Sequence, residues 1–373
     1  MKLVKSVCDS WRDEYAGKAE INMCTASIEP LTMNQLVDMC DATTKKKLCG
    51  FEEFLLSYPS TSEIVELKSR IADLYNCPIN HVITTTGTNL SNMMVFETLL
   101  DDGDEIVCVM PTHQQLFSVP RSMEITVKYY MVIEYENWKI DIRALEKLCN
   151  SHTKMIVINY PNNPLGLSLS DEEMNALIDL CERYDCYLLN DEVFYGLGSM
   201  KSFVGKYEKA IVTSSLSKSF GLPGIRVGWI VANEKVIEKL EIYREYLYVT
   251  PGRLDMCIAT IALSHKDQIL KRSNDIISKN VAYLKEWLEN EKYFTGFIPN
   301  SGTTAFIGYR ILDATSKDVA LDILQKQSVL VIPGIAFGVE DYVRISVGIP
   351  FDEFKEGLKR ISNWMKEKKA WNR

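Results

Sequence analysis

Residues 214–229 read SSLSKSFGLPGIRVGW, and this stretch carries the strongest signal in the chain. It follows an apolar run that predicts a strand, so Lys218 lies just past the end of that strand, with hydroxyls at Ser215 and Ser217 and a guanidinium at Arg226. A lysine amine forms a Schiff base with an aldehyde, and hydroxyls with a guanidinium on one loop suit a phosphate group. Taken alone, the stretch is equally compatible with an ordinary loop lysine beside a solvated arginine.

The middle of the chain alternates short β-rich runs with helical patterns. Ser170 precedes one helical pattern and is followed three residues on by Glu173, which is a capping-box arrangement. Several of the β-rich runs are apolar throughout, as parallel strands covered on both faces are. The sequence therefore predicts an α/β fold whose large domain has a mainly parallel sheet flanked by helices. Its strands are expected at 105–110, 155–160, 186–190, 210–213 and 226–231.

The pattern changes after about residue 285 and predicts a smaller α+β domain. We expect an N-terminal arm with part of the small domain at 1–45, the large cofactor-binding domain at 46–285 and the C-terminal small domain at 286–373, with a long helix bridging the boundary. The small domain is expected to contain strands near 304–309, 329–332 and 343–347 and helices near 318–326 and 352–368.

Composition and charge exclude some classes of partner. The 373 residues carry a formal net charge of −8, which repels a nucleic-acid phosphate backbone over most of the surface. No window is apolar enough for a membrane helix, and the N-terminus lacks the apolar stretch of a signal peptide. The 10 cysteines are scattered, so neither a disulfide framework nor a metal site is predicted. We expect a reduced, cytoplasmic protein without nucleic-acid or membrane partners.

Four further segments place polar groups at the ends of predicted elements. Segment 84–90 (TTTGTNL) leads into a helix, where backbone N–H groups form an anion site. Segment 159–166 (NYPNNPLG) follows a strand, and segment 190–195 (NDEVFY) puts carboxylates at the C-terminal end of a strand, where α/β sheets bind ligands. Segment 343–348 (VRISVG) places an arginine inside an apolar strand, where charges are rare. Each segment alone also has an ordinary explanation, such as a turn.

Together and in this order, the five segments resemble the class I/II aminotransferase family, the aspartate-aminotransferase-like enzymes of fold type I. The resemblance runs from Tyr58 to Gly348, and the SLSK, GxRxGW and NNPLG motifs are its most specific parts. It implies pyridoxal 5′-phosphate as the cofactor and an amino acid as the substrate. Lys218 would hold the cofactor as a Schiff base and then move the Cα proton as a general base. Asp191 would pair with the pyridine nitrogen and keep the ring an electron sink.

The resemblance also assigns the remaining contacts. Asn163 would bond the phenolic oxygen of the cofactor and border the substrate, and Arg344 would bind the substrate α-carboxylate by a bidentate pair. Tyr58 would reach the phosphate from the neighbouring subunit, which implies a homodimer with shared active sites. Ala26 and Ser27 lie in a segment that matches the family poorly and would touch the substrate. The phosphate would be bound by Thr88, Asn89, Ser215, Ser217 and Arg226.

Two positions depart from the family pattern. Phe194 stands three residues after Asp191, where the family usually has a tyrosine that donates to the phenolic oxygen, and the loss of that donor destabilises the phenolate. His113 stands where an aromatic ring normally stacks on the cofactor. It either stacks as a neutral ring or also moves protons as a catalytic residue. Both departures favour outcomes other than plain transamination, and both leave cofactor binding intact.

The leading hypothesis is an aminotransferase that exchanges an amine between an amino acid and a 2-oxo acid. The alternative keeps the cofactor and Lys218 but ends in elimination, replacement, cyclisation or oxidation of an amino acid. A cofactor-binding transcription regulator needs a basic DNA-reading domain, which this acidic sequence does not offer, and an inactive paralogue is expected to lose Lys218 or Asp191 first. The substrate is left open, although a basic amino acid would be favoured by acidic residues at Asp13, Glu14 and Glu29 if they reached it.

Overall fold

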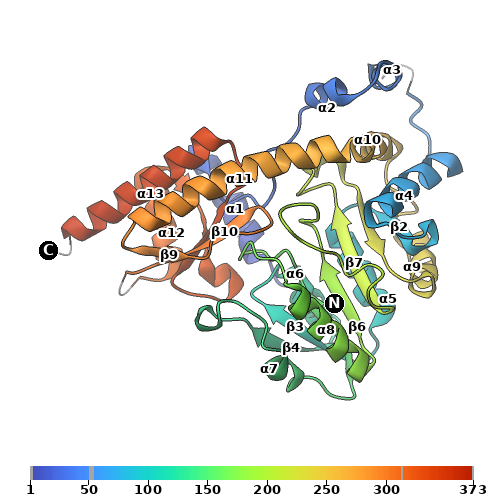
Figure 1. Ribbon diagram of the computed structural model, residues 1–373, viewed down its shortest axis with the longest axis horizontal. Helices are drawn as coiled ribbons and strands as arrows, with labels where there is room; N and C mark the ends of the chain where they lie inside the picture. Colours follow the sequence, from blue (N-terminus) through green and yellow to red (C-terminus); the bar gives the residue numbers. More distant parts are fainter. Residues whose placement is uncertain (1–2, 50–53, 312–313, 372–373) are drawn as a thin grey trace.

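The computed structural model describes residues 3–49, 54–311 and 314–371. At its centre is a seven-stranded sheet with the order β2-β8-β7-β6-β5-β3-β4 (Figure 1). Neighbouring strands from β7 to β4 pair in parallel, whereas β8 is antiparallel to both β2 and β7. The predicted mainly parallel sheet is therefore confirmed. Its strands are β2 (Val82–Thr85), β3 (Glu105–Met110), β4 (Thr126–Met131), β5 (Thr153–Ile158), β6 (Tyr187–Asp191), β7 (Ala210–Ser215) and β8 (Gly228–Val231).

Both faces of the central sheet are buried, which explains why its strands are apolar throughout. In β3, Ile106 and Cys108 belong to one buried cluster, whereas Val107 and Val109 belong to a second cluster on the other face. The first cluster is shared with α5 (Thr88–Leu99), α6 (Gln115–Ser122) and α9 (Glu234–Leu247). The second is shared with α4 (Thr61–Tyr75), α7 (Ile142–Glu146), α8 (Asp171–Tyr184) and α10 (Arg253–Ser264).

The capping box predicted at the start of α8 is confirmed. The Ser170 hydroxyl accepts a hydrogen bond from the Glu173 amide at 3.2 Å, and the Glu173 carboxylate accepts one from the Ser170 amide at 2.9 Å. These two bonds satisfy amide groups that have no partner within the helix.

The C-terminal part forms a four-stranded antiparallel sheet with the order β12-β13-β10-β9. Figure 1 shows α11 running from the side of α10 towards this sheet, as the bridging helix was expected to do. The elements are α11 (Lys266–Asn290), β9 (Phe294–Gly296), β10 (Thr304–Tyr309), α12 (Ser316–Gln327), β12 (Ile332–Pro333), β13 (Tyr342–Ser346) and α13 (Phe351–Trp371).

The predicted strands match the structure to within two residues at each end, except for the one at 329–332, and two of the differences have a clear physical cause. The strand expected at 226–231 begins only at Gly228, because Arg226 has a left-handed backbone with φ 38°. The strand expected at 329–332 is divided. Its first half, β11 (Val329–Leu330), pairs in parallel with β1 (Ile21–Asn22) of the N-terminal arm, and its second half is β12 of the antiparallel sheet. The shortened strand thus has a local cause, whereas the divided strand results from a pairing partner distant in sequence.

The N-terminal arm contains α1 (Val7–Tyr15), α2 (Met33–Met39) and α3 (Ala42–Cys49). Figure 1 shows α1 beside the C-terminal unit, which consists of the antiparallel sheet with α12 and α13, and shows α2 with α3 at the periphery of the molecule. The arm is thus divided between a part that joins the C-terminal unit and a part that leaves it. Within the three described ranges, no helix is long and apolar enough to cross a membrane.

Candidate active site

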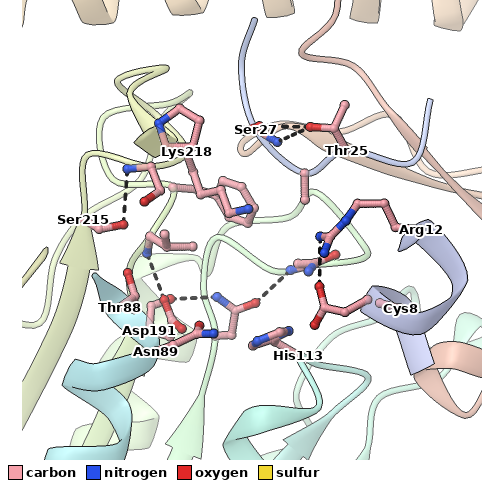
Figure 2. Close-up of a pocket in the computed structure, with 18 of the residues that line it drawn as sticks. Cys8, Arg12, Thr25, Ser27, Thr88, Asn89, His113, Asp191, Ser215 and Lys218 are labelled. Carbon is pink, nitrogen blue, oxygen red and sulfur yellow. Dashed lines mark hydrogen bonds and ion pairs between the residues drawn. The ribbon is translucent and has the colours of Figure 1, made fainter. Parts of the chain in front are cut away.

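A cavity of about 380 Å³ lies where the C-terminal ends of β6 and β7 meet the N-terminus of α5 (Figure 2). Such an edge is where ligands bind in α/β sheets. The wall also includes β13, the loop after β3 and the N-terminal arm, so it is built from segments far apart in the sequence. Of the candidate residues predicted from the sequence, the cavity is lined by Ala26, Ser27, Thr88, Asn89, His113, Asn163, Asp191, Phe194, Ser215, Ser217, Lys218, Arg226 and Arg344.

Lys218 lies in the turn after β7, and its side chain faces the cavity (Figure 2). Its backbone carbonyl accepts hydrogen bonds from the amides of Ile28 and Gly221, which fixes the turn. Burial, together with the positive charges of Arg344 and Arg12, lowers the pKa of Lys218 to about 8. The amine is therefore neutral far more often at neutral pH than an ordinary lysine amine, which makes it a better nucleophile and base.

Asp191 ends β6 and is buried, with 4% of its surface exposed. One carboxylate oxygen accepts a hydrogen bond from Asn92 Nδ2 at 2.9 Å, and the other accepts one from the Val193 amide at 3.1 Å. Burial raises the pKa of Asp191 to about 6 despite these two donors. A cationic partner in the cavity would offset the cost of holding this charge. Asn92 itself is oriented by Thr213, whose hydroxyl donates to Asn92 Oδ1 at 2.6 Å.

An anion cradle forms at the N-terminus of α5. Gly87 precedes the helix with φ 108°, and a Cβ there would lie 2.5 Å from Arg226 Nη2, so only glycine leaves room for this guanidinium. Arg226 Nη1 donates to Ser217 Oγ at 3.1 Å and to the Pro223 carbonyl at 3.0 Å. Thr88 Oγ1 is buried, and no residue of the described chain serves as its hydrogen-bond partner. Helix N–H groups, hydroxyls and a guanidinium together suit a phosphate.

Arg344 lies on β13, deep in the opposite wall, with 4% of its surface exposed. Its Nη1 donates to Asn163 Oδ1 at 3.0 Å and its Nη2 donates to the Cys24 carbonyl. Its Nε is buried and has no hydrogen-bond partner within the described ranges. A buried guanidinium without a carboxylate partner is costly, and it can bind a ligand carboxylate that enters the cavity.

The two departures from the family pattern also lie at this cavity. Phe194 is buried in its wall. The neighbouring Tyr195 does not replace the missing hydroxyl, because its oxygen donates to the Leu74 carbonyl at 2.9 Å. Burial, and then the charge of Lys218, lowers the pKa of His113 to about 4. His113 is therefore neutral at neutral pH, as the stacking interpretation requires.

Tyr58 is the one predicted site residue that does not line this cavity, and 79% of its surface is exposed. It lies instead in a surface hollow with Leu56 and Arg253. The acidic residues considered as selectors of a basic substrate, Asp13, Glu14 and Glu29, do not line the cavity either.

Several residues in the cavity wall were not predicted from the sequence. Helix α1 contributes Cys8, Asp9 and Arg12. Asn92 does not line the cavity but holds the Asp191 carboxylate, and it was also missed, although it lies one helical turn after Thr88, the spacing that places two residues on one helix face. No element was predicted for residues 7–15, and the proximity of this segment to the cavity depends on packing against distant segments.

Residues 28–361 match the protein family described as aminotransferase class I and II. The chain belongs to this family. A crystal structure of a PLP-dependent aminotransferase from Streptococcus suis 89-1591 superposes with a TM-score of 0.92 at 30% identity and covers 98% of this chain and 99% of that one. The sequence is also 28% identical to capreomycidine synthase of Streptomyces vinaceus, over 76% of this chain and 74% of that protein. It is 27% identical to aspartate aminotransferase of Sulfurisphaera tokodaii, over 85% and 84% of the two chains.

The cofactor of this aminotransferase-family enzyme is pyridoxal 5′-phosphate, and the residues of the cavity fit it. The cradle at Gly87 has room for an anion, with the buried Thr88 hydroxyl free to bond it. The amine of Lys218 and the buried carboxylate of Asp191 line the same cavity as the cradle. An aldehyde, a pyridine nitrogen and a phosphate therefore each have a chemically suitable partner.

Proposed function

We propose that this enzyme transfers the amino group of an amino acid to a 2-oxo acid. The observation that carries the proposal is the convergence of Lys218, Asp191 and Arg344 with the anion cradle in one cavity. These groups supply an amine, a carboxylate, a carboxylate-binding guanidinium and a phosphate site. Buried titratable groups with shifted pKa values that meet in one cavity are typical of an active site.

When bound, pyridoxal phosphate supplies an electron sink that stabilises negative charge at the substrate Cα. The Asp191 carboxylate would hold the proton at the pyridine nitrogen, and Asn92 keeps that carboxylate in place. Since the pKa of Asp191 is raised only to about 6, the carboxylate is ionised at neutral pH and can hold a cation. The phosphate would be held by Thr88, Asn89, Ser215, Ser217 and Arg226.

The amine of Lys218 would hold the cofactor and would serve as the base that moves the proton at the substrate Cα. Its lowered pKa suits both tasks, because a general base works best when its pKa lies near the operating pH. The guanidinium of Arg344 would bind the substrate α-carboxylate by a bidentate pair and fix the orientation of the Cα bonds. Asn163, which accepts from Arg344 through Oδ1, has its amide nitrogen left to donate to the phenolic oxygen.

A second outcome on the same site is elimination, replacement, cyclisation or oxidation of the amino acid. Phe194 favours it, because the phenolic oxygen then lacks a hydroxyl donor at that position, and Tyr195 is engaged with the Leu74 carbonyl. Fewer donors at this oxygen raise its proton affinity and change the electronic balance of the ring.

The experiment that separates the two outcomes is a single-turnover measurement. The cofactor-loaded enzyme is mixed with one amino acid at a time, without an oxo acid, while the absorption spectrum, oxo acid, ammonia and dissolved oxygen are recorded. Transamination predicts a spectral change that stops after one equivalent of oxo acid per site. Continued turnover that releases ammonia, releases a leaving group or consumes oxygen contradicts transamination and establishes the second outcome.

We further propose a homodimer whose active sites are shared. Leu56 and Tyr58 are 85% and 79% exposed beside Arg253, which donates at 2.7 Å to the Leu55 carbonyl and so holds this segment in place. Ile242 and Tyr246 on α9 are exposed as well. Exposed apolar side chains in this number are typical of an interface. In such a dimer Tyr58 reaches the phosphate of the neighbouring subunit.

Subunit complementation tests the shared sites. In the proposed dimer, each site takes Lys218 from one subunit and Tyr58 from the other. A mixed dimer of a Lys218→Ala subunit and a Tyr58→Ala subunit therefore has one site with both changes and one site with neither. Mixing the two inactive variants after partial unfolding and refolding should restore about a quarter of the wild-type activity. No recovery, with dimers shown by light scattering, would contradict the contribution of Tyr58 across the interface.

Two finer assignments stay predictions of ours. The division into an arm and part of the small domain at 1–45, a large domain at 46–285 and a small domain at 286–373 rests on the change of pattern along the chain. A cytoplasmic location is proposed because the buried cysteines Cys108, Cys181 and Cys186 are free thiols, which suit a reducing compartment.

A further inference from the structure

Helix α1 is fixed over the cavity by contacts on two sides. Trp11 is buried, and its Nε1 donates to the Val331 carbonyl of the C-terminal unit at 2.9 Å. At the start of the helix, the Val7 amide donates to Gln114 Oε1 at 2.8 Å, and Gln114 Nε2 donates to the Lys5 carbonyl at 3.1 Å. Gln114 follows His113 of the cavity wall directly. The helix is therefore attached to both parts of the molecule that enclose the cavity.

Helix α1 also brings Cys8, Asp9 and Arg12 to the wall of the cavity. Figure 2 shows Cys8 and Arg12 on the side away from Thr88 and Ser215 of the phosphate cradle. If the phosphate is bound at the cradle and the α-carboxylate at Arg344, this side is left for the substrate side chain. The groups of α1 are then the ones that a long side chain meets.

The charges on this face are unequal. Arg12 Nη1 pairs with Asp9 at 2.9 Å, and Arg12 Nη2 and Nε both donate to Asp13 Oδ1 at 3.1 and 3.2 Å. One positive charge thus faces two negative charges, so Arg12 is already neutralised. Although burial opposes it, hydrogen bonding from Ser6 with the charge of Arg12 keeps the pKa of Asp9 below its ordinary value, so the carboxylate is ionised.

We propose that Asp9 selects an amino acid whose side chain ends in a cationic, hydrogen-bond-donating group, a guanidinium or an ammonium. This deepens the proposed function and rests on it. The carboxylate of Asp9 binds the terminal cation by charge-assisted hydrogen bonds. Arg12 positions Asp9, and the negative charge of Asp13 compensates the repulsion between Arg12 and that cation. An acidic side chain would have to displace Asp9 or Asp13 from Arg12, and therefore binds worse.

Asp9 also has a structural role that the test must separate. Ser6 caps α1 and accepts from the Asp9 amide at 3.2 Å, and Asp9 pairs with Arg12 one turn on, both of which stabilise the helix. A purely structural role would affect all amino acids alike. A role in recognition changes only the preference for a charged side chain over a neutral one of the same shape.

The test compares matched pairs of amino acids on the cofactor-loaded enzyme. L-arginine is compared with L-citrulline, L-lysine with L-norleucine, and L-glutamate with L-glutamine. The half-saturating concentration of each is measured from the change in cofactor absorption without an oxo acid, and kcat/KM is measured separately. The variants are Asp9→Asn, Asp9→Glu and Arg12→Gln. Glu14→Gln is the matched control, because it removes the same charge from an exposed position of the same helix that does not line the cavity.

The wild-type enzyme should bind arginine or lysine at least about tenfold more tightly than its neutral counterpart. Asp9→Asn should abolish this preference while leaving citrulline and norleucine within about twofold, and Asp9→Glu should restore part of it. Arg12→Gln should not weaken the basic amino acid relative to its neutral counterpart, and Glu14→Gln should behave as wild type.

Three results would overturn the proposal. The first is a wild-type preference for glutamate over glutamine that Arg12→Gln abolishes. The second is an equal loss for charged and neutral amino acids in Asp9→Asn, which would show a structural role alone. In both cases the proposed function survives, because amino acids still change the cofactor spectrum. The third is a spectrum that no amino acid alters, which would refute the proposed function and this inference with it.

Discussion

Replacing Gly87 with alanine tests the phosphate cradle most directly. The added Cβ would lie 2.5 Å from Arg226 Nη2 and 3.2 Å from its Cζ, so the guanidinium must move away from the N-terminus of α5. A displaced guanidinium loses a charge-assisted hydrogen bond to the phosphate, which contributes about 1.5–3 kcal/mol. Cofactor affinity should therefore fall by roughly 10- to 150-fold. Separately, an alanine at φ 108° and ψ 162° strains the backbone, which should lower the free energy of unfolding by about 1–3 kcal/mol.

A matched control separates these two costs. Gly103 also has a positive φ of 89°, but a Cβ there meets nothing within 4 Å. Gly103→Ala should therefore lower the free energy of unfolding and leave cofactor affinity unchanged, whereas Gly87→Ala should change both. Affinity is measured by titrating the cofactor-free protein with pyridoxal phosphate, and unfolding by denaturant titration. Wild-type affinity in Gly87→Ala would refute the assignment of Arg226 and Gly87 to the phosphate.

Three further predictions concern titration within the same cavity. In the cofactor-free protein, burial and the charges of Arg344 and Arg12 set the pKa of Lys218 to about 8, so aldehyde uptake should rise with pH to a midpoint near 8. At pH 7 the neutral fraction of the Lys218 amine is then about 300-fold that of an ordinary lysine amine. A stopped-flow pH–rate profile of aldehyde uptake with a midpoint above 10 would contradict the lowered pKa of Lys218. Asn92→Ala removes a hydrogen-bond donor from the Asp191 carboxylate and so raises the pKa of Asp191 further. Cofactor affinity should therefore fall more at pH 6 than at pH 8, and an equal loss of affinity at both pH values would contradict this role of Asn92. Phe194→Tyr adds a hydroxyl donor and should lower the pH at which the absorption of the bound cofactor changes, whereas an unchanged spectrophotometric titration would mean that the hydroxyl does not reach the phenolic oxygen.

The elements that the sequence predicted well are those whose cause is local. The run EIVCVM predicted β3 over its full length, because a parallel strand buried on both faces leaves no polar alternation. The pair Ser170 and Glu173 predicted the start of α8, because the capping bonds join residues three positions apart. The cavity residues 88, 163, 191 and 218 were found for a related reason, since each lies at the start of a helix, at the end of a strand or within five residues after a strand.

The elements that were missed depend on long-range contacts. Helix α1 reaches the cavity because Trp11 bonds Val331, 320 positions away, and because Gln114 holds the Val7 amide. No window of sequence contains that information. The strand predicted at 329–332 was divided for the same reason, since β11 pairs with β1 at the other end of the chain. Propensity locates elements, whereas the partner of an edge or a helix face is decided by the whole fold.

One chain of hydrogen bonds joins the substrate side of the cavity to the cofactor side. Arg344 Nη1 donates to Asn163 Oδ1 at 3.0 Å, and the backbone N–H of Asn163 donates to Asn159 Oδ1 at 3.0 Å. Asn159 Nδ2 in turn donates to the backbone carbonyl of Asp191 at 2.7 Å. The Asp191 carboxylate in turn accepts from Asn92. Each amide side chain in this chain is fixed by a backbone or charged group, so the guanidinium and the carboxylate cannot shift independently. Because an error of about 1 Å between reacting groups costs roughly 100-fold in rate, this coupling is a reason for three buried asparagines in a cavity where apolar side chains would pack at lower cost.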